Sequence, residues 1–123
     1  MTRCLSAIVP VVLLAALGSC AKAAPSPPVQ STTIAMTSAG VSPKNVAISV
    51  GQRVMFINND GRSHNMTSDP HPEHTDCPEI NQVGFLTSGQ SRETGNLNIA
   101  RTCGFHDHDL PGSTSFQGSI TIR

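Results

Sequence analysis

The chain has 123 residues, lacks tryptophan and tyrosine, and carries eight basic and eight acidic side chains, so its formal net charge is zero. This length allows one small domain once a leader segment is removed. The neutral balance argues against nucleic-acid binding through a basic face. The sequence also has neither a serine-nucleophile elbow nor a phosphate-binding glycine loop, which argues against a hydrolase or a nucleotide-binding protein.

Residues 1–19 are predicted to be a signal peptide. The uncharged apolar run over 5–17 follows a basic residue and is too short to cross the hydrocarbon core of a membrane, which needs roughly 20 apolar residues. The tetrapeptide 17–20, Leu-Gly-Ser-Cys, is similar to a bacterial lipobox, whose cysteine becomes the lipidated first residue. We expect an exported protein anchored through a lipid on Cys20 to the cell envelope, facing the periplasm or the cell surface. Ordinary cleavage near Ala24 is the alternative.

The remaining chain divides into a tether and one domain. Residues 20–33 are predicted to be the lipidated cysteine followed by a flexible linker. The linker is expected because the segment is rich in Ala, Pro, Ser and Thr. Residues 34–123 contain short β-type runs broken by turn residues, without the 3.6-residue apolar period of a long helix. These features predict an all-β, Greek-key two-sheet β-sandwich of about seven strands. The expected strands are 34–36, 45–50, 52–58, 84–86, 91–94, 97–102 and 118–122.

A segment rich in histidine, proline and acidic residues interrupts this pattern over 67–83. It holds His71 and His74 with three prolines and four acids, so we expect a long functional loop or a small appended lobe. All five histidines lie in the second half of the chain, and such clustering indicates metal binding. Six of the eight acids flank these histidines, which predicts a partner protein with a basic surface.

A second group of metal-binding residue types lies near the C-terminus. Cys103 is followed by His106 and His108, and His64 lies far upstream. A thiolate combined with two imidazoles is what a blue-copper electron-transfer centre needs, because sulfur favours Cu(I) while nitrogen suits both oxidation states. The sequence therefore predicts a copper protein.

Three blocks of the sequence resemble the plastocyanin-like cupredoxins. The block 42–59 is similar to the family's pair of strands joined at a glycine, and 60–65 resembles the loop that delivers the first histidine ligand. The segment 102–106, together with the final run 118–122, resembles the ligand loop and the last strand. The resemblance implies a cupredoxin sandwich that binds one copper ion, cycling between Cu(I) and Cu(II).

The resemblance also implies a ligand set. His64, Cys103 and His106 correspond to the in-plane ligands when the plastocyanin-like Cys-x2-His spacing applies. The azurin-like Cys-x4-His spacing selects His108 instead. Asn65 is implied to fix the first ligand loop by hydrogen bonds.

One position departs from the family pattern. The usual axial methionine is replaced by Phe116, and no methionine follows Met66. Gln117, a backbone carbonyl, or an imidazole from His71, His74 or His108 are the candidates for the axial position, and loss of the thioether would change potential and geometry.

The state of Cys77 decides between two kinds of site. In an exported protein Cys77 and Cys103 are able to form a disulfide, which would remove the thiolate and leave a histidine-type copper or zinc site. Two free thiols would preserve the blue-copper centre, with Cys77 as a further ligand. The sequence leaves both states open.

These observations favour a monomeric, non-enzymatic copper protein that passes single electrons to a redox partner protein. The alternative is a copper storage, delivery or resistance module that uses His71, His74 and His108 in a non-blue site. A copper enzyme is a third hypothesis, because 104–108, Gly-Phe-His-Asp-His, is similar to the copper strand of copper-zinc superoxide dismutases. The further metal and disulfide residues that follow this motif in those enzymes are missing here.

Overall fold

The computed structural model describes residues 27–123, so the predicted signal peptide and the lipidated Cys20 lie outside the described residues. None of the helices in this range has the length and apolar character of a membrane span. The range contains ten strands and two short 3-10 helices. They are β1 (Val29–Gln30), β2 (Thr33–Thr37), β3 (Gly40–Ser42), β4 (Asn45–Ile48), β5 (Met55–Asn58), β6 (His64–Ser68), η1 (Pro78–Gln82), β7 (Gly84–Leu86), β8 (Ser91–Glu93), β9 (Arg101–Asp107), η2 (Thr114–Phe116) and β10 (Gly118–Ile122).

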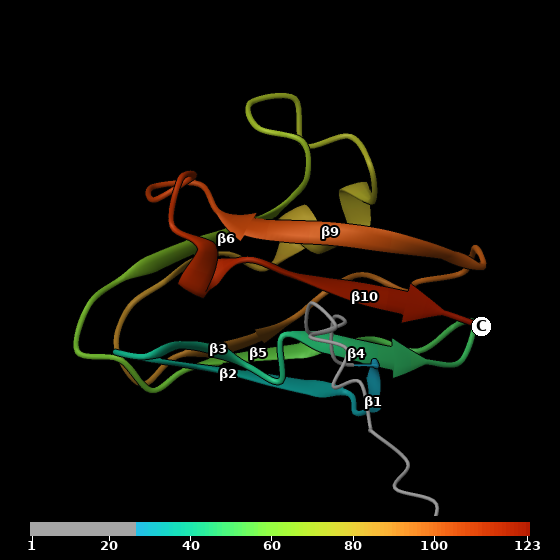
Figure 1. The fold of residues 1–123 in the computed structure, drawn as a ribbon, viewed down its shortest axis with the longest axis horizontal. Coiled ribbons are helices and arrows are strands. Elements are labelled where there is room, and N and C mark those ends of the chain that lie inside the picture. The colour runs from blue at the N-terminus through green and yellow to red at the C-terminus, as the bar shows by residue number, and fades with distance from the viewer. Residues whose placement is uncertain (1–26) are drawn as a thin grey trace, which may run out of the picture.

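The strands form two stacked sheets (Figure 1). The larger sheet has six strands in the order β1-β4-β10-β9-β6-β7, and the smaller has four in the order β3-β2-β5-β8. Both sheets are mixed, since β4 runs parallel to β1 and β10 while β9 runs antiparallel to β10 and β6. The predicted all-β sandwich is confirmed, with more strands than the seven expected.

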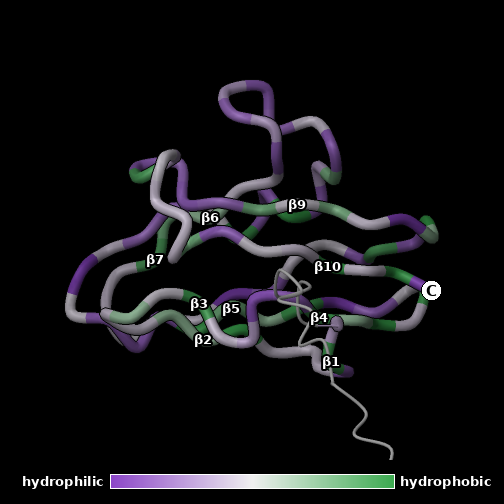
Figure 2. The backbone as a smooth tube through the Cα atoms, viewed as in Figure 1, coloured by the Kyte–Doolittle hydropathy of each residue, from purple (hydrophilic) through white to green (hydrophobic). Residues whose placement is uncertain are grey.

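The core lies between the sheets and is held by aliphatic side chains around two phenylalanines. Phe56 of β5 and Phe105 of β9 meet edge to face with ring centroids 5.2 Å apart, which joins the two sheets. Val46 and Ile48 on β4 point into the same layer, because alternate residues of a strand share a face. The tube in Figure 2 is green along much of β4 and β5 and mostly purple in the loop above β9.

Two strands differ from the sequence-based prediction. The expected strand 97–102 does not form, and pairing begins at Arg101 and continues to Asp107. Leu97 instead contacts the core from an irregular segment, where its backbone bonds to Gly51 and Gln52. Strand β6 was not predicted, because it has only one large apolar residue; its inward-facing polar groups are satisfied by distant side chains.

The sequence-based prediction also missed two short strands, β1 and β3, which precede and follow β2 in the chain. β1 lies within the segment predicted as a flexible linker, and it pairs with β4 through Val29 and Val46. β3 pairs with β2. Both strands have two or three residues, which is too short for an alternating pattern to stand out in the sequence.

A loop over 69–77 rises from the end of β6 and returns at η1 (Figure 1, above β9). It is held at its base by the backbone bond from Asp69 N to Gly104 O at 3.0 Å and by the bond from Asp76 N to Asp69 O at 2.9 Å. The long functional loop expected over 67–83 therefore contains a strand end, this outer loop and a 3-10 helix. Its position brings the loop histidines over β9.

Candidate metal centre

Strand β9 divides the residues of the predicted copper site between two faces. Cys103 and Phe105 belong to the buried core, and Phe105 meets Phe56 of the opposite sheet. Because successive side chains of a strand point to opposite faces, His106 points outward, and His108 follows it on that side just past the end of the strand. The outward face of β9 is the one that the loop over 69–77 covers.

Four imidazoles meet on this outer face. His71 and His74 come from the loop, and His106 and His108 come from β9 and the turn after it; one potential ligand atom from each lies within 4.8 Å of all the others. The His108 Nδ1 and His74 Nε2 atoms are 2.9 Å apart. A tetrahedral ion with metal–nitrogen bonds of about 2.0–2.1 Å needs its ligand atoms about 3.3 Å apart, so small side-chain movements would complete a four-nitrogen site.

Two of these imidazoles are oriented by hydrogen bonds from their other ring nitrogen. His106 Nδ1 lies 2.5 Å from Asp69 Oδ1, and His74 Nδ1 lies 2.8 Å from the Ser68 carbonyl oxygen. Donation from Nδ1–H in both pairs leaves a lone pair on Nε2, which faces His108 Nδ1 in His74 and Thr67 Oγ1 in His106 and would have to turn from these partners to a metal. Metal-binding histidines in proteins are usually oriented by a carboxylate or a backbone carbonyl in this way.

Gly104 allows the carboxylate to reach His106. It lies on the outward face of β9, where a side-chain Cβ would occupy the space of the Asp69 carboxylate. The Asp69 backbone is fixed there by its bond to the Gly104 carbonyl. The absence of a side chain at Gly104 is therefore part of how Asp69 holds His106.

His71 differs from the other three in its surroundings. Its side chain is exposed, whereas His106 is 2% exposed beneath the loop. Partial desolvation, followed by the nearby imidazoles of His108, His106 and His74, lowers the pKa of His71 below its ordinary value. A lowered pKa favours the neutral imidazole, which is the form that binds metals.

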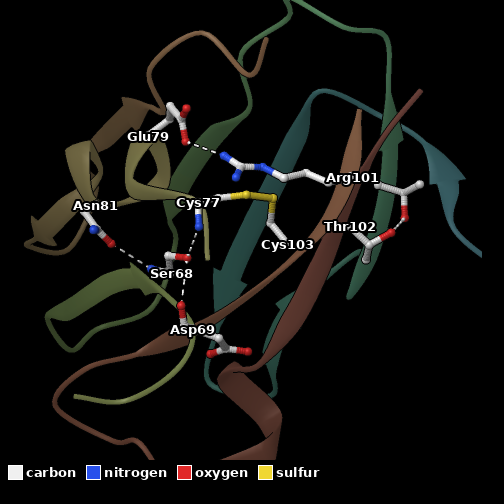
Figure 3. Close-up of a disulfide and its surroundings, with 9 residues drawn as sticks. Ser68, Asp69, Cys77, Glu79, Asn81, Arg101, Thr102 and Cys103 are labelled. Atoms are coloured by element: carbon white, nitrogen blue, oxygen red, sulfur yellow. Dashed lines mark hydrogen bonds and ion pairs between the residues drawn. A yellow bond between two sulfur atoms is a disulfide. The ribbon is translucent and has the colours of Figure 1, made fainter. Parts of the chain in front are cut away.

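Cys103 is not part of this cluster. Its sulfur is bonded to Cys77, which ends the loop, with the two Cα atoms 5.9 Å apart (Figure 3). Both cysteines are fully buried, and the Cys77 backbone N–H is held by Ser68 Oγ at 2.8 Å. Of the two states left open, the disulfide is the one found, and a disulfide sulfur is not a thiolate, so Cys103 in this structure does not offer a ligand to copper.

His64 also lies away from the other histidines, on the inner side of the larger sheet. Its Nδ1 is 2.7 Å from Asp107 Oδ2 and its Nε2 is 2.9 Å from Asp60 Oδ2, so both ring nitrogens are occupied. Phe116 stacks on the ring with centroids 4.4 Å apart. Asn65, the expected support of this loop, acts through its backbone, which bonds to Asp107 and His108.

This arrangement favours the ionised form of Asp60. The hydrogen bond from His64 is the main reason that the pKa of Asp60 lies below its ordinary value of 3.8, with smaller contributions from Gly61 and Arg62; burial acts in the opposite direction. The carboxylate is thus stabilised in its ionised form. His64 and Asp60 form a buried polar contact within the sandwich.

A blue-copper centre made of His64, Cys103 and His106 does not fit these residues. The sulfur is consumed by the disulfide, the nitrogens of His64 face two carboxylates, and His106 points to the opposite side of β9. Phe116, at the expected axial position, offers only an aromatic ring, and the Gln117 amide bonds to the Pro111 carbonyl. Of the predicted ligands, only His106 and His108 are brought together, and their binding of a metal stays a prediction.

His71 and His74 were recognised in the sequence as a metal signal but not as partners of His106 and His108. The available indication of a shared site was the occurrence of a His-x-x-His pair and a His-x-His pair in the same sequence. Their convergence depends on Asp69 and on the disulfide, which fold the loop back over β9.

Of the six acidic side chains that flank the histidines, three are paired with other side chains. Asp69 bonds to His106, Asp107 to His64, and Glu79 to Arg101 at 3.2 Å (Figure 3). The remaining members, Glu73, Asp76 and Asp109, are exposed.

No family model matches the sequence, and no curated protein does. Solved structures do share the fold. A purple cupredoxin from Nitrosopumilus maritimus superposes with a TM-score of 0.59 at 19% identity, covering 76% of this chain and 100% of that one. Oxidized plastocyanin from Dryopteris crassirhizoma gives 0.56 at 18% identity over 74% and 99% of the two chains. A mutant amicyanin in the reduced state gives 0.57 at 14% identity over 74% and 80%. The fold is therefore cupredoxin-like.

Proposed function

We propose that this protein binds one copper ion through the imidazoles of His71, His74, His106 and His108, and that it stores or delivers the metal. The observation that carries this function is the convergence of the four rings on the outer face of β9, with two of them oriented by hydrogen bonds. An amicyanin variant that shares the cupredoxin-like fold has been solved with Cu(I), which supports the same metal.

Copper is favoured over zinc by the chemistry of the ligands. Imidazole suits both metals, but a given nitrogen site binds Cu²⁺ more tightly than Zn²⁺. The outer-face position also leaves the site accessible through the exposed side chain of His71. Tight binding of Cu(II) by nitrogen alone would give a non-blue copper centre.

Delivery fits this site better than electron transfer because the sulfur is missing. A thiolate stabilises Cu(I), and a site of four imidazoles lacks this stabilisation, so it binds the reduced ion less firmly than a thiolate-containing site would. A single-electron carrier needs firm binding in both states.

Electron transfer remains the second candidate, and the observation in its favour is the fold. A mutant plastocyanin of fern with this fold has been solved in oxidized and reduced form. In that case the acceptor would be a redox partner protein, with the exposed carboxylates Glu73, Asp76 and Asp109 favouring a basic surface on it. Neither candidate gives the protein a catalytic role, and both operate in a monomer.

The experiment that tests the copper site is a titration of the purified domain with Cu(II), followed by mass spectrometry of the folded protein. We expect one ion per chain, with loss of tight binding in His106→Ala and retention in the control Glu73→Gln, which changes the same loop without removing a ligand. Reduction with ascorbate in the presence of a Cu(I) chelator then separates the candidates. Release of copper supports delivery, and full retention with reversible reoxidation supports electron transfer.

We also propose that the protein is exported and held at the cell envelope by a lipid on Cys20. The support is the apolar leader and the lipobox-like tetrapeptide 17–20. Replacing Cys20 with Ala should move the protein from the membrane fraction to the soluble fraction. Equal fractionation of the two forms would contradict the anchor.

A further inference from the structure

The four histidines of the copper site are held unequally. His74 and His106 are fixed by Ser68 and Asp69, and the His108 backbone N–H bonds to the Asn65 carbonyl at 2.7 Å. Within residues 27–123, His71 makes no hydrogen bond through its ring. The rings of His74 and His106 are therefore oriented by groups outside the cluster, the His108 ring is held only by its contact with His74 Nε2, and the His71 ring has no such bond.

His71 also occupies the outermost position of the cluster. It follows Pro70 at the start of the turn at the outer end of the loop, and its side chain is exposed. Its ring centroid lies 5.6 Å from that of His74, 5.5 Å from that of His106 and 5.0 Å from that of His108. It thus contacts all three of the other rings from the solvent side.

Protein covers the cluster on the side of the buried His106, whereas His74 and His108 are half-buried and His71 is its most exposed member. β9 lies beneath it, with His106 opposite Thr67 of β6 in the sheet register. Asp69 fills the space beside Gly104, and the loop returns through Asp76. An incoming ligand therefore meets the metal on the side that His71 covers.

We infer that His71 is the exchangeable ligand through which copper enters and leaves, which rests on the proposed four-histidine site. The acceptor is a molecule that offers its own nitrogen or sulfur donor to the metal. Transfer begins when one bond forms between the donor atom and copper and the bond from copper to His71 breaks. Further donor atoms of the acceptor then replace the bonds to the other three histidines one at a time, and the ion leaves with the acceptor. The oxidation state does not change, and the released imidazole of His71 returns to solvent.

This asymmetry assigns two functions, retention of the ion and closure of the site, to different residues. His74, His106 and His108 would retain the ion, because hydrogen bonds hold the rings of His74 and His106 and the backbone of His108. His71 would close the site against loss of the metal to water. Replacement of a single flexible ligand is a smaller rearrangement than opening the loop, which the disulfide and the backbone bonds of Asp69 hold in place.

The test compares His71→Ala with His106→Ala in the full folded domain, using Glu73→Gln as the control on the same loop. Affinity for Cu(II) is measured by competition, and transfer to a histidine-containing acceptor peptide is followed by stopped-flow spectroscopy. We expect His71→Ala to keep one copper ion, to bind it at least about 10-fold less tightly, since even the loss of an outer-shell partner typically costs about 10–100-fold, and to transfer it faster than wild type. His106→Ala should lose tight binding.

A second measurement examines how the wild-type rate depends on the acceptor. Displacement of His71 by an incoming donor predicts a transfer rate that rises with acceptor concentration. A rate independent of the acceptor, unchanged transfer in His71→Ala, or loss of binding as complete as in His106→Ala would each overturn the role of His71. Failure of the wild-type domain to bind one copper ion would instead contradict the proposed four-histidine site itself.

Discussion

Cys103 and His106 lie on opposite faces of strand β9. The Cys103 sulfur is directed into the core and bonded to Cys77, while the His106 ring is directed outward to Asp69. Residues three apart in an extended strand cannot direct both side chains to one ion, because the faces alternate at each residue. The two residues that most strongly indicated a blue-copper centre therefore belong to two separate structures, a disulfide and a histidine cluster.

The disulfide is expected to stabilise both the fold and the metal site. It closes a segment of 26 positions and holds the loop that carries His71 and His74. Replacing both Cys77 and Cys103 with Ala should lower the free energy of unfolding by about 2–5 kcal/mol, as measured by urea denaturation of the metal-free domain. The affinity for copper should also fall, because the loop histidines lose their fixed position. Unchanged stability in the double variant would contradict this account of the disulfide.

His64 is expected to support the fold and not the metal. Replacing it with Ala would leave Oδ2 of the fully buried Asp107 without its partner, and breaking a buried pair in this way typically costs about 3–5 kcal/mol. The variant should still bind one copper ion at temperatures where it is folded. Thermal unfolding and a copper titration measure the two effects separately. A variant of normal stability that had lost its copper would place His64 among the ligands after all.

The contact between His64 and Asp60 predicts a particular dependence of stability on pH. Since the pKa of Asp60 is lower in the folded protein than its ordinary value of 3.8, the unfolded chain takes up a proton first as the pH falls. The stabilisation is thus complete above pH 3.8 and is lost as the pH falls through the lower, folded pKa. The stability advantage of wild type over Asp60→Asn should shrink in that acid range. An advantage that stays constant there would show that ionisation of Asp60 is not linked to folding.

Asp69 is expected to control the affinity of the metal site through His106. Asp69→Asn keeps the size of the side chain but weakens the hydrogen bond to the imidazole, so the affinity for Cu(II) should fall about 10–100-fold. Competition titration measures the change, with Glu73→Gln as the matched control. Equal affinities in the two variants would mean that Asp69 does not orient a ligand.

Gly104 provides an independent test of the same relationship. A Cβ at this position would displace the Asp69 carboxylate, so Gly104→Ala should weaken copper binding although it removes no ligand and no charge. Gly112 is the matched control, because a Cβ there meets no atom within 4 Å. If Gly112→Ala weakened binding as much as Gly104→Ala, the close approach of Asp69 would not be the cause.

The sandwich could be predicted because its strands carry local signals. Phe56 alternates with the less buried Met55 and Ile57, and 118–122 forms the strand that its β-branched residues indicate. Strand β6 could not be predicted in this way. The burial of His64 at its start is compensated by hydrogen bonds to Asp60 and to Asp107, and Asp107 lies 43 positions later in the chain.

The histidine cluster was partly predictable, and the ligand set was not. The concentration of histidines in 71–74 and 106–108 correctly marked two segments that meet in space. The spacing of Cys103 and His106, however, is compatible with a ligand loop or with a continuous strand. Only a continuous strand directs the two side chains to opposite faces. Strand β9 continues to Asp107 because it is paired on both sides, by β10 and by β6, and such pairing is not visible in a local sequence pattern.

The most direct test of the central claim is an optical and paramagnetic-resonance spectrum of the Cu(II)-loaded domain, combined with a thiol count before loading. A histidine-only site predicts no free thiol from Cys77 or Cys103, no intense visible absorption and a resonance pattern of nitrogen ligands. A free thiol together with an intense blue or purple colour would show that Cys103 binds copper and would contradict the four-histidine site.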